Sequence, residues 1–180
     1  SRWGPELRPF GVLRGVRGSR KGMAMAVQSV VTIGVYGRTG DEFLADLKDA
    51  RVDLLIDVRD RRGVRGKEYA WANKIALIDL LTNAGIAYRH ERGLATPMSL
   101  RKLQYAFDEK QHVGQRHRHL LSPAFRAAYG EQVLDKFDMK AMLDSLPAEA
   151  KTIALFCVEA DPEACHRSLA AGELHRVRAR

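Results

Sequence analysis

Two cysteines, a histidine and an arginine lie close together near the carboxyl end of this 180-residue chain. Cys157 and Glu159 follow a strand-like run, and Cys165, His166 and Arg167 fall at the start of a predicted helix. The free N–H groups and positive dipole end of a helix start favour anions and lower the pKa of a nearby thiol. This pattern predicts a reactive site. Cys165 or His166 would do nucleophilic or acid–base work, Glu159 would orient them, and Arg167 would bind a phosphate or carboxylate.

Both cysteines also have simpler interpretations. A buried cysteine often packs as a small apolar residue, and this is the favoured interpretation of Cys157, although its position also places it among the substrate-binding candidates. A Cys157–Cys165 redox pair lacks the Cys-x-x-Cys spacing, and a zinc site that includes His166 lacks the usual ligand spacing. We therefore expect neither a metal nor a cofactor.

Two further segments carry unusual side chains after a predicted strand. Asp57 stands at a strand tip, where it would act as a base or hold an arginine, and Arg59 and Arg65 follow in a basic, glycine-containing loop. The other segment contains the candidate ligand-binding residues Gly34, Tyr36 and Arg38. Ligands of open parallel sheets bind beyond the carboxyl ends of the strands. The sequence therefore predicts that these segments meet the cysteine segment at one edge of a sheet, although a charge run is often only a solvated face.

Short β-branched runs alternate with helical patterns, which favours an α/β fold. We expect a single three-layer domain over residues 25–180, with a mostly parallel sheet flanked by helices. The predicted strands and helices are as follows. Strands cover residues 29–36, 52–58, 86–90 and 152–156. A first helix begins at residue 40 or 41 and includes the apolar positions 43, 44 and 47, and further helices cover 73–83, 99–107, 122–143 and 161–177.

The net charge of +8 comes from the two ends of the chain. Residues 1–22 carry +5 and the last five residues carry +3, so bulk charge is a weak argument for nucleic-acid binding. We expect residues 1–24 to be a disordered basic extension, or else an arginine-rich arm that touches phosphates. No apolar run is long enough to cross a bilayer and no secretory leader is present, so we expect a cytoplasmic protein without a membrane partner. Residues 112–119, rich in histidine and arginine, are interpreted as a polar loop, with a metal or nucleic-acid contact as the alternative.

The motifs resemble those of a bacterial and archaeal family known as domain of unknown function 488. Its T-I-G strand, L-[IV]-D-[IV]-R strand and Tyr-x-His strand correspond to residues 32–34, 55–59 and 88–90. Its C-x-E-x-x-P-x-x-C-H-R segment corresponds in full to residues 157–167. One departure is Val35, where many members have histidine, and Tyr36 then replaces a small polar residue. The resemblance implies the fold and the location of the site, but no reaction.

The favoured hypothesis is an enzyme that acts on a phosphorylated substrate, a nucleotide or a nucleic acid. One form of this hypothesis is a mechanism like that of rhodaneses and cysteine phosphatases, because Cys157 ends a strand and Arg167 begins a helix. The loop between the two residues is, however, too long and lacks the glycines of those enzymes. The alternative class is a non-catalytic nucleic-acid or nucleotide-binding module that uses the basic loop and the arginine-rich ends. A structural or interaction protein is the third possibility, and the sequence leaves the oligomeric state open.

Overall fold

The computed structural model describes residues 11–13 and 27–180. Its sheet has the strand order β1 (Gly11–Leu13), β2 (Ser29–Ile33), β5 (Thr152–Phe156), β3 (Leu54–Asp57) and β4 (Ala87–His90). Strands β2, β5, β3 and β4 are parallel, and β1 pairs antiparallel with β2 at one edge. The predicted α/β class with a mostly parallel sheet is confirmed. The prediction for residues 1–24 lies outside the described residues, apart from β1.

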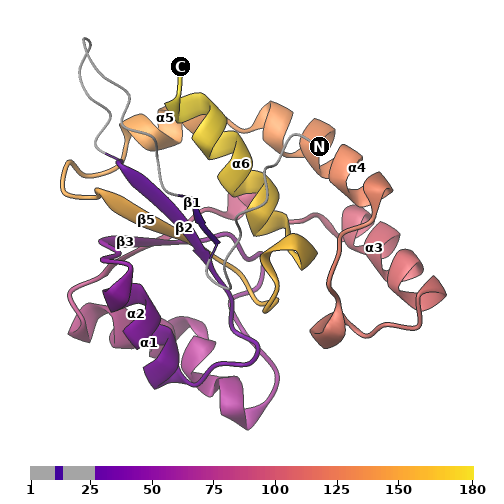
Figure 1. Cartoon of the computed structure of the whole chain (residues 1–180), viewed down its shortest axis with the longest axis horizontal. Coiled ribbons are helices and arrows are strands. Elements are labelled where there is room, and N and C mark those ends of the chain that lie inside the picture. Colours follow the sequence, from indigo (N-terminus) through magenta and orange to yellow (C-terminus); the bar gives the residue numbers. More distant parts are fainter. Residues whose placement is uncertain (1–10, 14–26) are drawn as a thin grey trace.

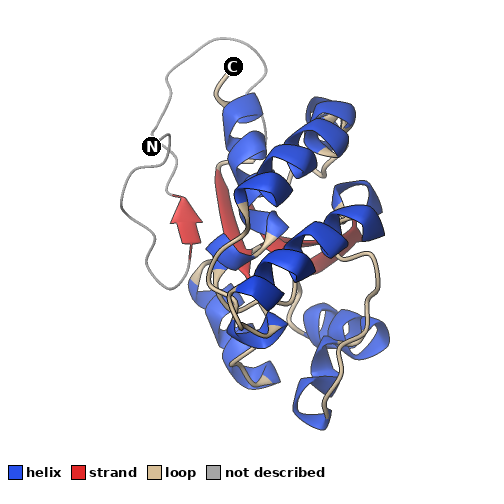
Figure 2. Cartoon of the chain, turned by 90° about the vertical axis from the view of Figure 1, so that its right-hand side faces the viewer, coloured by secondary structure: helices blue, strands red, loops and turns tan. Residues whose placement is uncertain are grey.

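The helices cover both faces of this sheet (Figure 1). They are α1 (Gly40–Asp49), α2 (Lys74–Asn83), α3 (Met98–Lys110), α4 (Pro123–Gln132), α5 (Met139–Asp144) and α6 (His166–Arg178). Helices α1 and α2 pack on one face, and α5 and α6 pack on the other. In the side view of Figure 2, blue helices largely cover the red strands.

Side chains alternate between the two faces along each strand, as the pleat of a strand requires. On β2, Val30 packs in the core beneath α5 and α6, whereas Val31 and Ile33 pack with α1 and α2. Helices α3 and α4 share a third, smaller apolar cluster around Leu100 and Tyr129. This α3–α4 pair lies beside the carboxyl ends of the parallel strands and so forms one side of the region where ligands are expected (Figure 1).

Local chemistry explains where most helices begin and end. Thr39 caps α1 with a full capping box, in which the backbone N–H of Thr39 donates to Glu42 at 2.8 Å. Gly85 follows α2 with a φ of +71°, a conformation that favours glycine. Ser122 accepts a hydrogen bond from the backbone of Phe125 at the start of α4. These three boundaries follow from the residue types that the sequence places there.

The prediction of one long helix over residues 122–143 is wrong. Helix α4 ends at Gln132, a short 3-10 turn covers Leu134–Lys136, and α5 begins only at Met139. Asp138 causes the new start, because its carboxylate accepts a hydrogen bond from the backbone N–H of Ala141 at 2.8 Å. Strand β2 is also shorter than predicted, because the N–H groups of Val35 and Tyr36 both turn toward the carbonyl of Val158.

The last helix has a break at its predicted start. Asp161 caps a 3-10 turn over Pro162–Ala164, and Cys165 then adopts an extended conformation (φ −135°, ψ 140°) before α6 begins at His166. Cys165 is therefore the N-cap residue of α6 rather than a residue within the helix. None of the helices in the described part of the chain is long and apolar enough to span a membrane.

Candidate functional site

A cavity of about 790 Å³ opens beyond the carboxyl ends of β2, β3 and β5. Residues from all three segments predicted from the sequence line it. These residues include Tyr36, Arg59, Arg65, Cys157, Glu159, Cys165 and His166. The parallel arrangement of the strands accounts for this, because each of the three strands delivers its following loop to the same edge.

Cys165 and His166 form a pair of neighbouring reactive groups in this cavity. The Cys165 Sγ atom lies 3.8 Å from Nδ1 of His166. The other ring nitrogen, Nε2, lies 3.1 Å from the carbonyl oxygen of Val58. A carbonyl can only accept, so Nε2 carries a proton and the ring is held with Nδ1 facing the sulfur. The ring of Tyr129, with its centroid 5.5 Å from that of His166, packs beside it.

The surroundings of this pair favour a thiolate and an imidazolium. Burial by itself raises the pKa of Cys165, but a hydrogen bond from Cys157 and the cations of His166 and Arg167 outweigh burial and hold that pKa well below its usual range. Burial by itself lowers the pKa of His166, yet the adjacent Cys165 thiolate raises it overall. The pKa of Cys157 is raised well above the ordinary thiol value by the hydrogen bond of Cys157 to Cys165, together with burial. Cys157 is therefore the protonated donor and Cys165 the ionised acceptor.

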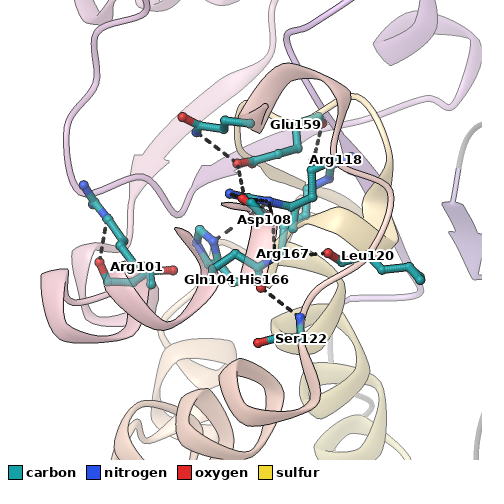
Figure 3. Close-up of polar contacts among 12 residues, drawn as sticks. Arg101, Gln104, Asp108, Arg118, Leu120, Ser122, Glu159, His166 and Arg167 are labelled. Carbon is teal, nitrogen blue, oxygen red and sulfur yellow. Dashed lines mark hydrogen bonds and ion pairs between the residues drawn. The ribbon is translucent and has the colours of Figure 1, made fainter. Parts of the chain in front are cut away.

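Glu159 is buried beside this pair and belongs to a network that reaches α3 (Figure 3). Burial, followed by the charge of Cys165, raises the pKa of Glu159 to about 7. One of its carboxylate oxygens lies 3.3 Å from Nε2 of Gln115 and 3.5 Å from a guanidinium nitrogen of Arg118. Asp108 in turn accepts from Nε of Arg118 at 2.9 Å. Glu159 can therefore hold or release a proton near neutral pH while it stays fixed in position.

Arg167 holds the loop that carries Glu159 and does not line the cavity. Its guanidinium is buried and donates to the carbonyl oxygens of Glu159 at 2.6 Å and Ala160 at 3.2 Å. Gly34 permits this close packing, since a Cβ atom there would lie 2.0 Å from the carbonyl oxygen of Glu159. The contacts of Arg167 and Gly34 indicate a positioning role, whereas the sequence predicted that both bind the substrate.

Asp57 and Arg59 form a buried ion pair. Arg59 donates to both carboxylate oxygens of Asp57, at 2.9 and 2.8 Å, and to the carbonyl oxygen of Ala72. The hydroxyl of Tyr88 donates to the same carboxylate at 2.7 Å. Asp57 does not line the cavity, whereas Arg59 does, and three of the five guanidinium N–H groups of Arg59 are engaged by Asp57 and Ala72. The contacts of Asp57 and Arg59 hold the loop that follows β3 in its conformation. Arg38, also outside the cavity wall, pairs with Asp46.

The sequence profile of the family described as "Domain of unknown function DUF488" matches residues 39–174. The chain belongs to the DUF488 family. The matched range includes the whole 157–167 segment of the cavity, whereas Gly34 and Tyr36 precede it. Searches among curated proteins and among solved structures found no match. Because the DUF488 description names no activity, function has to be inferred from the cavity itself.

The DUF488 cavity also contains residues that the sequence reasoning missed. Helix α3 contributes Arg101, Gln104 and Tyr105, and the turn around residues 114–118 contributes Gln115, Arg116, His117 and Arg118. The three α3 residues and Asp108 lie on one face of the helix. Polar residues at this spacing could have indicated from the sequence that this face lines the site. The 112–119 segment was interpreted as a polar loop, with a metal or nucleic-acid contact as the alternative, because nothing local indicates that it lies against Glu159.

The wall of the DUF488 cavity is basic. Asp108 and Glu159 neutralise Arg118, and Asp60 pairs with Arg101. Arg61 and Arg65 are exposed at the cavity, and neither forms an ion pair within the described residues. These two guanidinium groups are therefore available to an anion that enters the cavity.

Three of the cavity residues could also hold a metal ion. The ligand atoms of Cys157, Cys165 and His166 all lie within 4.8 Å of one another and are buried. Two sulfurs and an imidazole suit a thiophilic cation such as Zn²⁺. The spacing of the three residues along the chain did not suggest such a set, because the fold and not the spacing brings Cys157 back to the start of α6.

Proposed function

We propose that this DUF488 protein is a thiol-dependent enzyme that acts on a phosphorylated substrate, a nucleotide or a nucleic acid, bound in the 790 Å³ cavity. The observation that carries the proposal is the Cys165–His166 pair, whose facing atoms lie 3.8 Å apart on the cavity wall. A cysteine with a lowered pKa beside a histidine is the arrangement that nucleophilic catalysis needs.

The chemistry follows from the protonation states of this pair. The Cys165 sulfur forms a bond to the electrophilic atom of the substrate while the bond to the leaving group breaks, and His166 gives the leaving group its proton. A water molecule then attacks the same atom, the bond to sulfur breaks, and neutral His166 takes the proton of the water. The thiolate and the imidazolium are restored, and the net reaction is hydrolysis. Glu159, adjacent to both groups, stabilises the imidazolium when ionised.

The basic wall supports an anionic substrate. Arg61 and Arg65 lie on the cavity with no carboxylate partner in the described part of the chain, and Tyr36 and Tyr105 add aromatic surface. Guanidinium groups bind phosphate oxygens in pairs, and aromatic rings stack on bases. The same wall therefore suits the phosphate and the base of a nucleotide.

The first experiment measures the reactivity of Cys165 and its protection. Iodoacetamide at neutral pH should alkylate Cys165 much faster than an ordinary thiol, and Cys157→Ser should retain this rate whereas Cys165→Ser abolishes it. AMP, ATP or a short single-stranded oligodeoxynucleotide should slow the alkylation. Arg65→Gln should weaken that protection, and the matched control Arg126→Gln, on the exposed side of α4 and outside the cavity, should not.

The second experiment looks for turnover of the same compounds and of p-nitrophenyl phosphate. Turnover that disappears in Cys165→Ser and His166→Asn supports the enzyme. The proposal fails if Cys165 reacts like an ordinary thiol, and it also fails if no phosphorylated compound protects Cys165. It also fails if the purified protein contains one zinc ion per chain that blocks alkylation and is lost in Cys157→Ser, because metal-bound water would then replace the thiolate.

A non-catalytic nucleic-acid-binding module is the second candidate, favoured by the same arginines and by Tyr105, which is 46% exposed at the cavity. It predicts salt-dependent binding of the oligodeoxynucleotide that is unchanged in Cys165→Ser and weaker when residues 1–22 are removed. Such binding without turnover of any compound would favour this candidate over the enzyme. Binding that survives both that deletion and the loss of Arg61 and Arg65 would exclude it.

A further inference from the structure

Cys157 does not react with the substrate in the proposed reaction, yet its thiol lies next to the reactive one. The chain has two cysteines, and both are buried, reduced and on the wall of the same cavity. Their sulfur atoms lie within 4.8 Å of each other. Cys157 follows β5, where its backbone N–H donates to the carbonyl of Ile33 at 3.3 Å, whereas Cys165 lies between a 3-10 turn and α6. The fold therefore brings together two thiols from separate elements.

We propose that Cys157 is the resolving thiol of Cys165, so that a hydroperoxide converts the pair reversibly into an intrachain disulfide at the floor of the cavity. A disulfide has an S–S distance of about 2 Å, so the sulfurs have to approach by less than about 3 Å. Rotation of the two side chains can supply a movement of this size. The inference rests on the reactivity of Cys165 in the proposed function, but it requires no particular substrate.

The oxidation proceeds in two balanced steps. The Cys165 thiolate attacks an oxygen of the hydroperoxide, an S–O bond forms as the O–O bond breaks, and His166 protonates the departing alkoxide or hydroxide. The sulfur of Cys157 then attacks the Cys165 sulfenic acid, the S–S bond forms as the S–O bond breaks, and the leaving hydroxide takes the proton of Cys157 as water. Overall the two thiols lose two electrons and two protons, and the hydroperoxide is reduced to an alcohol or water.

The surroundings favour this order of events. His166 faces the Cys165 sulfur at 3.8 Å, so the proton donor for the first step is already beside the attacking atom. The sulfur of Cys157 lies within 4.8 Å of the Cys165 sulfur, so the second thiol is held next to the sulfur that is oxidised. Both cysteines are buried but line the cavity, which is the side from which a small oxidant would approach them. Formation of the disulfide removes the nucleophile, so the oxidised protein should be inactive until a thiol reductant restores it.

The test uses the full chain treated with limiting hydrogen peroxide. Intact mass and a free-thiol count in denaturant should show the loss of two hydrogen atoms and of both thiols in the monomer, and dithiothreitol should reverse the change. In Cys157→Ser the disulfide cannot form within the chain, so dimedone should trap a sulfenic acid on Cys165 at least tenfold more than in the wild type. Cys157→Ala serves as a second variant, and thermal melting confirms that both fold.

Three results would overturn the inference: both thiols persist in the wild type under peroxide, dimedone labels the wild type and Cys157→Ser equally, or Cys165 is over-oxidised at the same rate in both. Each can occur while iodoacetamide still reacts rapidly with Cys165, in which case the proposed function stands and only the role of Cys157 fails. Conversely, an intrachain disulfide in a protein that no phosphorylated compound protects would support this inference and contradict the proposed function.

Discussion

Glu159→Gln should become more stable relative to the wild type as the pH rises, because the variant has no buried carboxyl that ionises. Burial and the charge of Cys165 raise the pKa of Glu159 from 4.5 to about 7 in the folded protein. Below pH 4.5 the group is protonated in both the folded and the unfolded state and costs nothing. As the pH rises from 4.5 through 7, the unfolded chain ionises first, so the folded state becomes progressively less favourable. Above pH 7 the full penalty is present, the opposite of the usual ion-paired carboxylate.

The size of this penalty follows from the two pKa values. At about 1.4 kcal/mol per pH unit, the interval between 4.5 and about 7 corresponds to about 3 kcal/mol. The linkage relation places about 1 kcal/mol of it at pH 5 and nearly all of it at pH 8. Glutamine has no charge to bury, so the penalty is absent in the variant. The stability of Glu159→Gln relative to the wild type should therefore increase by about 2 kcal/mol between pH 5 and pH 8.

Urea unfolding followed by circular dichroism at pH 5, 6, 7 and 8 measures this difference. Glu163→Gln is a matched control, because Glu163 lies four residues along the chain and is exposed. Its difference from the wild type should stay flat over the same range. A flat difference for Glu159→Gln as well, or a variant that loses stability relative to the wild type as the pH rises, would show that the carboxyl is not held in a desolvated site next to the Cys165 thiolate.

Three further substitutions probe the other parts of the site. His166→Asn removes the imidazolium that lowers the pKa of Cys165, so the pH midpoint of iodoacetamide labelling should rise, and the rate at pH 7 should fall about tenfold or more. Gly34→Ala places a Cβ against the carbonyl of Glu159, which should cost about 2 kcal/mol or more in urea unfolding, and equal stability would contradict the packing. In Arg167→Lys the amine cannot reproduce both carbonyl contacts, so the free energy of unfolding should fall by about 3 kcal/mol and Cys165 should be labelled more slowly. If the variant loses only the protection by phosphorylated compounds, Arg167 binds the substrate directly.

Local patterns were sufficient to predict the layers of the fold and the edge where the site lies. The apolar runs around Val31 and Leu55 match buried parallel strands, and the cap at Thr39 and the glycine at Gly85 have the roles that their residue types predict. Because the strands are parallel, their crossover connections place the loops that line the cavity at the same edge. These features depend on short segments of sequence, so a single chain reveals them.

The features that were not predicted depend on contacts between distant segments. Arg167 looks like an anion ligand at the start of a helix, but the carbonyls of Glu159 and Ala160 occupy its guanidinium. The turn that carries Gln115 reaches Glu159 across 44 residues of sequence, and no periodicity reports such a contact. The break at Asp138 was also missed, because the apolar pattern continues across it and only the capping interaction reveals a new helix.

If the substrate carries a phosphate, the negative charge of the Cys165 thiolate makes the basic wall of the cavity necessary. A phosphate charge about 5 Å from the Cys165 thiolate is repelled by about 3 kcal/mol at an effective dielectric constant of about 20. His166 offsets part of this repulsion, but it is already engaged with the sulfur at 3.8 Å. Arg167 is held by carbonyl groups and Arg118 by carboxylates, so neither is free to move toward the phosphate. Arg61 and Arg65, which are exposed on the cavity wall and form no ion pair within the described residues, are then the groups best able to supply the compensating attraction. A neutral electrophile such as iodoacetamide should not need them.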